Sequence, residues 1–539
     1  MIYIGKEHTF TLEDFRKIVF ERKKMAITPA AIIRLNKTRR FINHLLENNI
    51  KVYGLTTGFA DLRNCPVSPN DAALLSNNII ESHDAGIGPS LPKDVVLGAM
   101  VTRAVSLAKG HSGFQVESLM TLIDMINHEI IPFVPQTGSL GASGDLAFLA
   151  RVGRAMRGDD VPVWFQDDII SAKKALKLAK ISPFAPQAKE GLAMTNGTSF
   201  MISMMSIAYL KEINAFENIL AMQGLFLNAV GAVDAAFNGC IQEVRNQAGQ
   251  AEIAKILSGY LKDSPFIDFM GIQDDYCIRC LPQLLGPKLE MILAQRLKIE
   301  SELDAVTDNP LIFKDYEISD DVYKGRMIPF EGENWVVLSG GNFHGECITS
   351  MADTIAIANA KIAFTMERQI TYMLNPFRNK NRLPAYLVPR SGLSSGYMIT
   401  QYTANGLTQK IAALASPTSP FNITSANESE DVVSYGATAA QRLLEQIERL
   451  EELNTIYLTV SVQAYSIARK KLSSSHPIPP NLLSERLFQI IQEITAEEYP
   501  IEREENFQKR YDKMRIILNS GLKQKLAELP LIDLASCTS

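Results

Sequence analysis

The segment Pro135–Arg151, PQTGSLGASGDLAFLAR, constrains the chain more than any other stretch of its sequence. Its residues Gly141-Ala142-Ser143-Gly144-Asp145 follow neither a helical nor a strand period. Four of these five are glycine, alanine or serine, and glycine reaches backbone conformations that are closed to other residues. The apolar run Leu146–Ala150 follows at once and predicts the start of a helix. We therefore expect a tight turn that leads into a helix N-terminus, with Asp145 near the cap.

Two familiar functions do not fit this turn. A nucleophile elbow needs a glycine two residues after its serine, and the residue two after Ser143 is Asp145. A phosphate-binding loop needs a Gly-Lys-Ser/Thr sequence, which does not follow here.

Chemistry of the backbone itself is the alternative to a plain turn. If the turn presses the Gly144 nitrogen onto the Ala142 carbonyl, a five-membered ring can close. Loss of two waters, one of them from Ser143, then leaves an electrophilic methylidene group.

The string Gly-Ser-x-Gly-Ala-Ser-Gly-Asp-Leu, starting at Gly138, resembles the signature of the aromatic amino acid ammonia-lyases. In that family the Ala-Ser-Gly tripeptide becomes 4-methylidene-imidazol-5-one (MIO). The resemblance extends from about residue 10 to residue 480 and implies that Ala142, Ser143 and Gly144 form this cofactor. It also implies a mainly helical fold and a homotetramer whose active sites are shared between subunits.

Tyr53 opens a second motif, YGLTTGF, in a segment that breaks the helical periodicity. By its residues alone this tyrosine could simply anchor a loop. The resemblance makes it the catalytic base, although a phenol normally titrates near 10 and needs neighbours that favour the phenolate. Thr56 stands where the family commonly has Asn, and Ala60 where it commonly has Gly. Asn196 lies in the sequence Asn-Gly-Thr, which is typical of a turn. The resemblance implies that Asn196 positions the MIO carbonyl and the substrate.

Three site residues are implied by the string QDDYCIRCLPQ, which resembles Gln-Asp-x-Tyr-x-x-Arg-Cys of the family. The resemblance makes Gln273 and Arg279 substrate-binding residues and Tyr276 a catalytic one, with Cys277 where serine is common. Tyr276 and Arg279 are three residues apart and would share a face of a helix. A guanidinium is suited to a bidentate grip on the carboxylate of an amino acid.

The remaining candidates would shape the side-chain pocket. His83 follows serine at a place where histidine and tyrosine ammonia-lyases carry histidine and phenylalanine lyases usually carry an apolar residue. Phe343 would pack at the MIO ring, and His344 would support the site from behind. Glu430, in SANESEDVVSYG, falls at the family's acidic position when the segment is aligned on its downstream Val-Ser. Alignment on Asn427 would select Ser429 instead, and we choose Glu430.

Composition and charge exclude several classes of protein. The 539 residues are 46% hydrophobic and 21% charged, with a net charge of −5, and no basic cluster points to a nucleic acid. The uncharged run from Asn218 to Val233 is too short to cross a bilayer. Six cysteines are dispersed and the N-terminus has no export signal, so reduced thiols in the cytoplasm are expected. Cys277 and Cys280 form a lone CxxC, and neither zinc nor another metal is expected.

Periodicity predicts a mainly α protein with a long antiparallel central helix bundle and a smaller mixed N-terminal region that carries the ring-forming loop. We divide the chain into 1–197, the loop region; 198–483, the central bundle; and 484–539, a helical C-terminal segment. Helices are expected at 11–21, 30–47, 71–81, 92–108, 117–130, 342–372, 396–414 and 439–458. Long helices are expected over 198–304 with a break near Ser264-Pro265, short strands and polar linkers over 160–190, and a hairpin and loop over 311–338.

The residues and the resemblance together predict an enzyme that eliminates ammonia from an aromatic L-amino acid, with L-histidine and trans-urocanate as substrate and product. A tyrosine ammonia-lyase, in which His83 would bond the phenol and the product would be p-coumarate, is the nearest alternative. A MIO-dependent aminomutase comes next. A non-catalytic scaffold is disfavoured by the intact Ala142-Ser143-Gly144, Tyr53 and Arg279. A serine hydrolase is disfavoured by the mismatch at Asp145.

Overall fold

The computed structural model describes residues 1–318 and 321–521. Contacts divide the chain into two compact units, each discontinuous in sequence. Unit 1 comprises Met1–Ile207, Arg296–Ala352 and Thr418–Gln441, and unit 2 comprises Ala208–Gln295, Asp353–Pro417 and the chain from Arg442 onward. The three contiguous segments inferred from the sequence remain a prediction, and the end of the third segment, with Cys537, lies outside the described residues.

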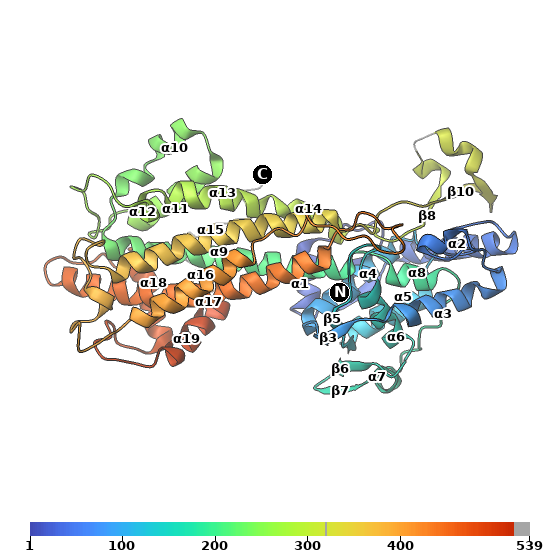
Figure 1. Cartoon of the computed structure of the whole chain (residues 1–539), viewed down its shortest axis with the longest axis horizontal. Helices are drawn as coiled ribbons and strands as arrows, with labels where there is room; N and C mark the ends of the chain where they lie inside the picture. The colour runs from blue at the N-terminus through green and yellow to red at the C-terminus, as the bar shows by residue number, and fades with distance from the viewer. Residues whose placement is uncertain (319–320, 522–539) are drawn as a thin grey trace. The chain divides into compact units, whose positions relative to one another are not determined.

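Helices dominate both units, which confirms the mainly α prediction (Figure 1). Unit 1 contains α1 (Leu12–Val19), α2 (Pro29–Glu47), α3 (Ala72–His83), α4 (Lys93–Ala108), α5 (Val116–Asn127), α6 (Leu146–Met156), α7 (Ala172–Ala179) and α8 (Glu190–Thr195). Unit 2 contains α10 (Gly239–Arg245), α11 (Ala248–Leu261), α12 (Tyr276–Arg279), α13 (Leu281–Leu293), α16 (Met398–Ala413), α18 (Leu483–Thr495) and α19 (Phe507–Ile516). The boundary between the units falls inside α9 (Ser199–Val230), α15 (Glu346–Leu374) and α17 (Gly436–Ser473), and next to the start of α14 (Gln295–Leu303).

The strands are short and all belong to unit 1 among the residues that the structure describes. They form four small sheets: β1 (Ile2–Ile4) with β2 (Met25–Ile27); β3 (Ile87–Ser90) with β5 (Pro135–Thr137); β4 (Ile131–Pro132), β6 (Pro162–Phe165) and β7 (Asp168–Ser171); and β8 (Leu311–Lys314), β10 (Glu333–Leu338) and β9 (Ile328–Phe330). Only β1 and β2 pair in parallel. These sheets tie the loops of unit 1 together and build no extended layer.

Helix α4 is the central core element of unit 1. Its sequence is apolar around nearly the whole circumference, and every residue from Val95 to Ala108 is buried. Arg103 is the one charged side chain in that run, and none of its surface is exposed. A helix that is apolar all round belongs in a core, and α4 packs against α1, α5 and β4 of the same unit.

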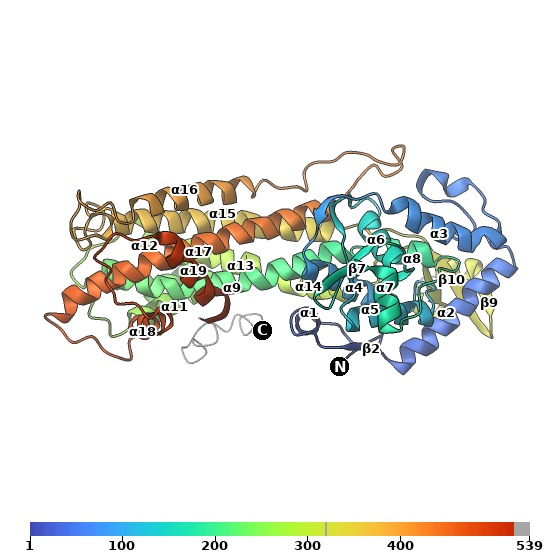
Figure 2. The same ribbon diagram turned by 90° about the horizontal axis from the view of Figure 1, so that it is seen from below.

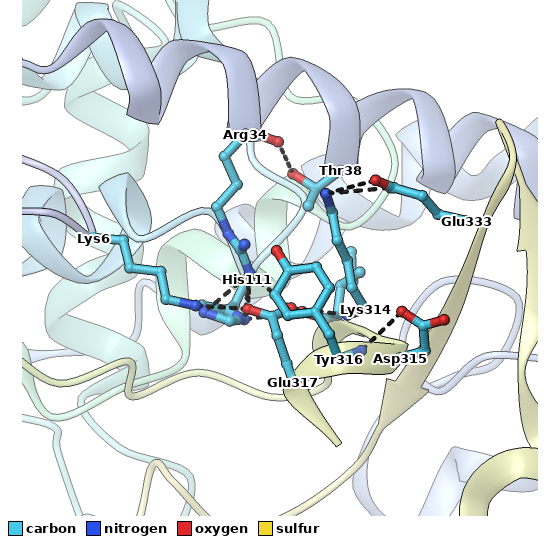
Figure 3. A network of polar contacts seen from close by, with 10 residues as sticks. Lys6, Arg34, Thr38, His111, Lys314, Asp315, Tyr316, Glu317 and Glu333 are labelled. Carbon is cyan, nitrogen blue, oxygen red and sulfur yellow. Dashed lines mark hydrogen bonds and ion pairs between the residues drawn. The ribbon is translucent and has the colours of Figure 1, made fainter. Parts of the chain in front are cut away.

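The sheet β8–β10–β9 is anchored on α2 by apolar and charged contacts. A buried cluster unites Phe41 and Leu45 of α2 with Ile312 and Trp335 of the sheet. Beside it, the Glu317 carboxylate accepts hydrogen bonds from Lys6 Nζ (2.6 Å), Arg34 Nη2 (2.9 Å) and the Lys314 backbone nitrogen (2.8 Å) (Figure 3). The same apolar cluster contains Val52 and Leu55, which hold the loop around Tyr53 in place.

Polar side chains link the long helices inside unit 2. Gln223 of α9 bonds Gln369 of α15, whose Oε1 also accepts a hydrogen bond from Tyr457 of α17 (2.6 Å). Near the start of α16, Gln401 donates a hydrogen bond to Thr371, close to the end of α15. Near the end of α16, the Ile411 carbonyl accepts a hydrogen bond from Gln446 of α17, which also donates to the Ala356 carbonyl in the first half of α15. α16 therefore runs antiparallel to α15. Both views show these long helices side by side (Figures 1 and 2).

One polar pair in this bundle holds a carboxyl group away from water. Asn359 Nδ2 of α15 donates to Glu212 Oε2 of α9 (2.8 Å), while Glu212 Oε1 and Asn359 Oδ1 are buried without hydrogen-bond partners. Burial raises the pKa of Glu212 to about 7. A protonated Glu212 has a hydroxyl donor for the unpartnered amide oxygen of Asn359. Burial and the unpartnered amide oxygen of Asn359 therefore both favour the protonated form of Glu212.

Several local expectations needed correction. The segment 160–190 holds β6 and β7 as predicted but also the helix α7. The expected long helices of 198–304 are one long helix, α9, followed by shorter ones, while the break predicted near Ser264-Pro265 is confirmed. The hairpin predicted for 311–338 has a third strand, and α17 continues beyond 458 to Ser473 because apolar spacing persists to Tyr465. No helix in the described ranges is long and apolar enough to cross a membrane.

Candidate active site

The Gly141–Asp145 segment is a tight turn that precedes α6, as predicted. Gly141 and Gly144 have φ angles of +77° and +79°, in the region that favours glycine. Asp145, however, does not cap α6 with its side chain. Its buried carboxylate accepts hydrogen bonds from the backbone nitrogens of Phe200 (2.7 Å) and Met201 (3.1 Å), at the start of α9. Burial raises the pKa of Asp145 to about 7.

The turn lies directly against the Asn196-Gly197 peptide. Gly144 and Gly197 form a parallel β-bridge, and the backbone nitrogen of Asp145 donates to the Gly197 carbonyl oxygen at 2.7 Å. A Cβ atom on Gly144 would lie 2.3 Å from that oxygen, so only glycine fits. Asn196 Nδ2 donates to the Ser143 carbonyl oxygen at 2.7 Å. The short segment Asn196-Gly197 thus holds both the carbonyl of Ser143 and the backbone at Gly144.

Glu430 reaches the turn from a distant part of the chain. Its Oε1 accepts a hydrogen bond from Ser143 Oγ at 2.8 Å, and its Oε2 accepts one from Ser425 Oγ at 2.6 Å. Ser425 and Glu430 face each other across an isolated antiparallel bridge, closed by three residues with positive φ, Ala426 to Glu428. The hydroxyl of Ser429 turns back to the Ala426 carbonyl. The carboxylate that faces the turn is therefore that of Glu430.

Tyr53 is partly buried, its ring contacts Phe59, and the nearby Val52 and Leu55 belong to the apolar cluster on α2. The backbone nitrogen of Ala60 donates to Tyr53 Oη at 3.0 Å. Ala60 has a φ of +48°, where a non-glycine residue costs roughly 1–2 kcal/mol. Thr56 closes the turn by bonding the backbone of Val52 and Ile50. The two departures from the family motif are thus compatible with the loop. Thr56 forms hydrogen bonds to the backbone within it, and Ala60 adopts a positive φ at a small cost in free energy.

A cavity of about 460 Å³ brings these groups together. Its wall includes Tyr53, His83, Ala142, Ser143, Asn196, Phe343, His344, Ser429 and Glu430, all from unit 1, and apolar side chains of Ile79, Leu146, Leu192 and Val432. Burial lowers the pKa of His83, although the backbone of Ile79 and the charge of Glu430 oppose this. His344 Nε2 lies 3.2 Å from the Val432 carbonyl oxygen. The cavity thus brings together the imidazole of His83, the carboxylate of Glu430 and the phenol of Tyr53.

Gln273, Tyr276 and Arg279 belong to unit 2 and do not line this cavity. Tyr276 and Arg279 share a face of the short helix α12, as predicted: the guanidinium lies 4.7 Å from the centre of the Tyr276 ring. The Tyr276 side chain is 69% exposed. The Cys277 carbonyl oxygen of the same helix accepts a hydrogen bond from Gln369 Nε2 at 2.9 Å. The five described cysteines, including Cys277 and Cys280, are free.

Sequence reasoning missed the charged groups behind the turn. Arg103, Lys189 and Asp308 are each almost completely buried within unit 1, and Arg103 Nη1 donates to the Asn196 carbonyl oxygen at 2.6 Å. A signal was present for Arg103, since it is the one charge within the apolar stretch Val95–Ala108. Arg63 was also missed; it lines the cavity and donates to the Ala60 carbonyl.

Comparison with known proteins places this site in a family. The chain matches the aromatic amino acid lyase family over residues 10–493. Histidine ammonia-lyase 1 of Fusobacterium nucleatum is 34% identical over 469 residues, which cover 86% of this chain and 87% of that protein. Histidine ammonia-lyase of Geobacillus thermodenitrificans is 35% identical over 460 residues, or 85% and 87% of the two chains.

Solved structures show the same fold. Histidine ammonia-lyase from Trypanosoma cruzi superposes with a TM-score of 0.84 and 26% identity, covering 98% of this chain and 96% of that one. A phenylalanine aminomutase from Pantoea agglomerans superposes with a TM-score of 0.85, at 24% identity, over 96% and 99% of the chains. The chain belongs to the aromatic amino acid lyase family. It is a carbon–nitrogen lyase of the ammonia-lyase type.

Proposed function

We propose that this enzyme eliminates ammonia from L-histidine and releases trans-urocanate. The observation that carries the proposal is the meeting of Glu430 and His83 in one cavity with the Ala142-Ser143-Gly144 turn and Tyr53. A carboxylate accepts the N–H of an imidazole, and a neutral histidine can donate or accept a hydrogen bond. The similarity to histidine ammonia-lyases at about a third identity supports the same substrate. We further propose that the enzyme works in the cytoplasm, in keeping with its free cysteines.

We propose that Ala142, Ser143 and Gly144 cyclise to MIO, and the surroundings of the turn fit that group. No side chain separates Gly144 from Gly197, the Ser143 carbonyl already has a donor in Asn196, and Ala142 and Ser143 line the cavity. The cofactor supplies an electrophile for the substrate amine and makes that amine a leaving group. Asn196 Oδ1 is buried without a partner at the cavity wall, so it is available to accept a hydrogen bond from the substrate.

Side chains of the protein then remove the β-proton of the substrate and bind its carboxylate. Tyr53 lies at the cavity wall and removes a β-proton of the substrate, and collapse of the resulting carbanion-like state expels ammonia. Arg279 binds the substrate carboxylate, with Gln273 and Tyr276 beside it. Phe343 packs against the substrate region of the turn. The protein thus supplies orientation and electrostatics while the electrophile carries the difficult step.

Glu430 is the residue that we expect to separate histidine from tyrosine. Ser143 Oγ donates a hydrogen bond to Glu430 Oε1 before the ring forms, and the Ser143 hydroxyl is eliminated when the ring forms. The freed carboxylate oxygen faces the cavity, where an imidazole N–H can satisfy it. A phenol has one donor, which His83 can engage without Glu430. A tyrosine ammonia-lyase is therefore the second candidate, since His83 suits both rings.

Glu430→Gln should lower kcat/KM for L-histidine much more than kcat/KM for L-tyrosine. Loss of a hydrogen bond to a charged acceptor typically costs ~1–3 kcal/mol, or roughly tenfold or more in preference. Steady-state kinetics of wild type and mutant with both amino acids measure the difference, and the intact mass of the mutant checks that its cofactor has formed. An equal loss for both substrates, or a wild type that prefers tyrosine, would favour the tyrosine alternative.

We propose a homotetramer in which each site combines the unit 1 cavity of one subunit with Gln273, Tyr276 and Arg279 of another. The wide exposure of Tyr276 and the absence of these residues from the cavity wall support such sharing. Closed symmetric oligomers are the usual form of soluble assemblies.

Co-expression of Tyr53→Phe with Arg279→Met should restore activity that neither variant has alone. Random pairing leaves roughly a quarter of shared sites with both native residues. The matched control is Tyr53→Phe with Glu430→Ala: both residues line the same cavity of one chain, so no mixed site is intact and activity should stay absent. Recovery in neither mixture, or an active monomer, would contradict the shared site.

A further inference from the structure

Arg103 occupies an unusual position for a charged side chain. It lies in the apolar core helix α4 with none of its surface exposed. Nη1 donates to the Asn196 carbonyl oxygen at 2.6 Å, Nη2 donates to Ser106 Oγ at 2.9 Å, and Asp308 Oδ1 lies 3.9 Å away. Nε has no hydrogen-bond partner. An arginine so placed is costly to bury, which suggests a role beyond filling the core.

The guanidinium lies directly behind the Asn196-Gly197 peptide, against which the ring-forming turn packs. A Cβ atom on Gly197 would lie 2.2 Å from Arg103 Nη1, and a Cβ atom on Gly144 would lie 2.3 Å from the Gly197 oxygen. Arg103, Gly197 and Gly144 are therefore stacked with no room for one additional carbon between neighbours. On the turn side, Gly197 accepts from the Asp145 nitrogen and Asn196 holds the Ser143 carbonyl.

We propose that Arg103 is a positioning residue for the self-cyclisation of Ala142-Ser143-Gly144. It fixes the Asn196-Gly197 peptide from behind, so that this peptide confines the turn in the bent form that closes the ring. The proposal rests on the proposed function, because it assumes that MIO forms. Arg103 touches neither the substrate nor the reacting atoms and acts only through Asn196 and Gly197.

The step that it assists balances without any added reagent. The Gly144 nitrogen bonds to the Ala142 carbonyl carbon, and the carbonyl oxygen leaves as water with the protons of the Gly144 and Ser143 nitrogens. The Ser143 Cβ–Oγ bond then breaks, and the hydroxyl leaves as water with the Ser143 α-proton. Closure requires the attacking nitrogen and the carbonyl carbon to stay close together. Misplacement by about 1 Å can slow such an intramolecular step by ~10²-fold.

Intact mass measured over time after synthesis of the full-length chain tests this role. Wild type should become two waters lighter, whereas Arg103→Met should do so ~10²-fold more slowly and retain a full-weight fraction although its circular dichroism is native. Arg510→Met is the matched control. Arg510 is 3% exposed and is held by Tyr499 and Glu505 in unit 2, so its loss also removes a buried arginine but should leave dehydration at the wild-type rate.

Ser106→Ala provides a milder variant in case Arg103→Met does not fold, since it keeps the guanidinium and removes the hydroxyl that accepts from Nη2 and from the Thr307 backbone nitrogen. Slower dehydration in Ser106→Ala supports the proposal, and dehydration at the rate of the control overturns it, as does prompt dehydration of folded Arg103→Met. A wild type that keeps its full weight would instead refute the cofactor of the proposed function. The two failures are therefore distinguishable.

Discussion

Ser143→Ala should fold normally and lose turnover by on the order of 10⁴-fold or more, the scale seen when a covalently acting group is removed from an active site. The Ser143 side chain makes one described hydrogen bond, to Glu430, so its loss should cost only about 1 kcal/mol of stability. Alanine at this position has no hydroxyl to eliminate. The methylidene group cannot form, and the substrate amine then has no electrophile to make it a leaving group.

The measurement combines steady-state kinetics with the intact mass of the purified protein. Wild type should weigh two waters less than its encoded sequence, and the mutant should not show that deficit. Ser429→Ala is the matched control because Ser429 lines the same cavity but bonds the Ala426 carbonyl. It should retain the mass deficit and most of the activity. A Ser143→Ala enzyme as active as this control would refute the MIO interpretation.

Tyr53→Phe should lower kcat by ~10²–10⁴-fold, the usual contribution of a general base. The ring keeps its contact with Phe59, and only the hydrogen bond from the Ala60 nitrogen is lost. The binding of histidine should change little, because phenylalanine preserves the shape of the cavity wall. Substrate affinity measured by calorimetry, together with single-turnover rates, separates the two effects. A mutant that loses affinity but keeps its chemical rate would assign Tyr53 to binding instead.

The pH dependence of kcat/KM in the wild type should reflect the titration of Tyr53. Burial raises the pKa of Tyr53, the Ala60 nitrogen lowers it, Glu430 raises it and Arg63 lowers it, with a net rise. The base acts when deprotonated, so kcat/KM should increase with pH towards that raised pKa. Glu430→Gln removes a negative charge and should move the acid limb to lower pH. Arg63→Gln should move it to higher pH, by a smaller amount because Arg63 is exposed.

Sequence reasoning predicted the parts of the site that depend on local patterns. The small residues at 141–144 predicted a tight turn before a helix, and the spacing of Tyr276 and Arg279 predicted a shared helical face. The mainly helical fold also followed from periodicity. These features need only neighbouring residues, so the pattern alone is sufficient to predict them.

Contacts between distant segments were beyond such patterns. Asp145 is the N-cap residue of α6, as expected, but no local pattern predicts that its carboxylate accepts hydrogen bonds from the start of α9 more than fifty residues later. The choice between Ser429 and Glu430 depended on the hairpin at 425–430, where two of the three left-handed residues, Ala426 and Glu428, are not typical of a turn. Which predicted residues share one cavity also required the folded chain, since Tyr53 and Glu430 are far apart in sequence.

The most direct measurement is the kcat/KM of purified wild-type enzyme for L-histidine, L-tyrosine and L-phenylalanine, followed by the absorbance of each acrylate product. We expect trans-urocanate to form with the highest kcat/KM, because Glu430 and His83 both suit an imidazole. Faster formation of p-coumarate or cinnamate would contradict the histidine assignment. Absence of all three acrylates from protein that has lost its two waters would contradict the lyase reaction on these substrates.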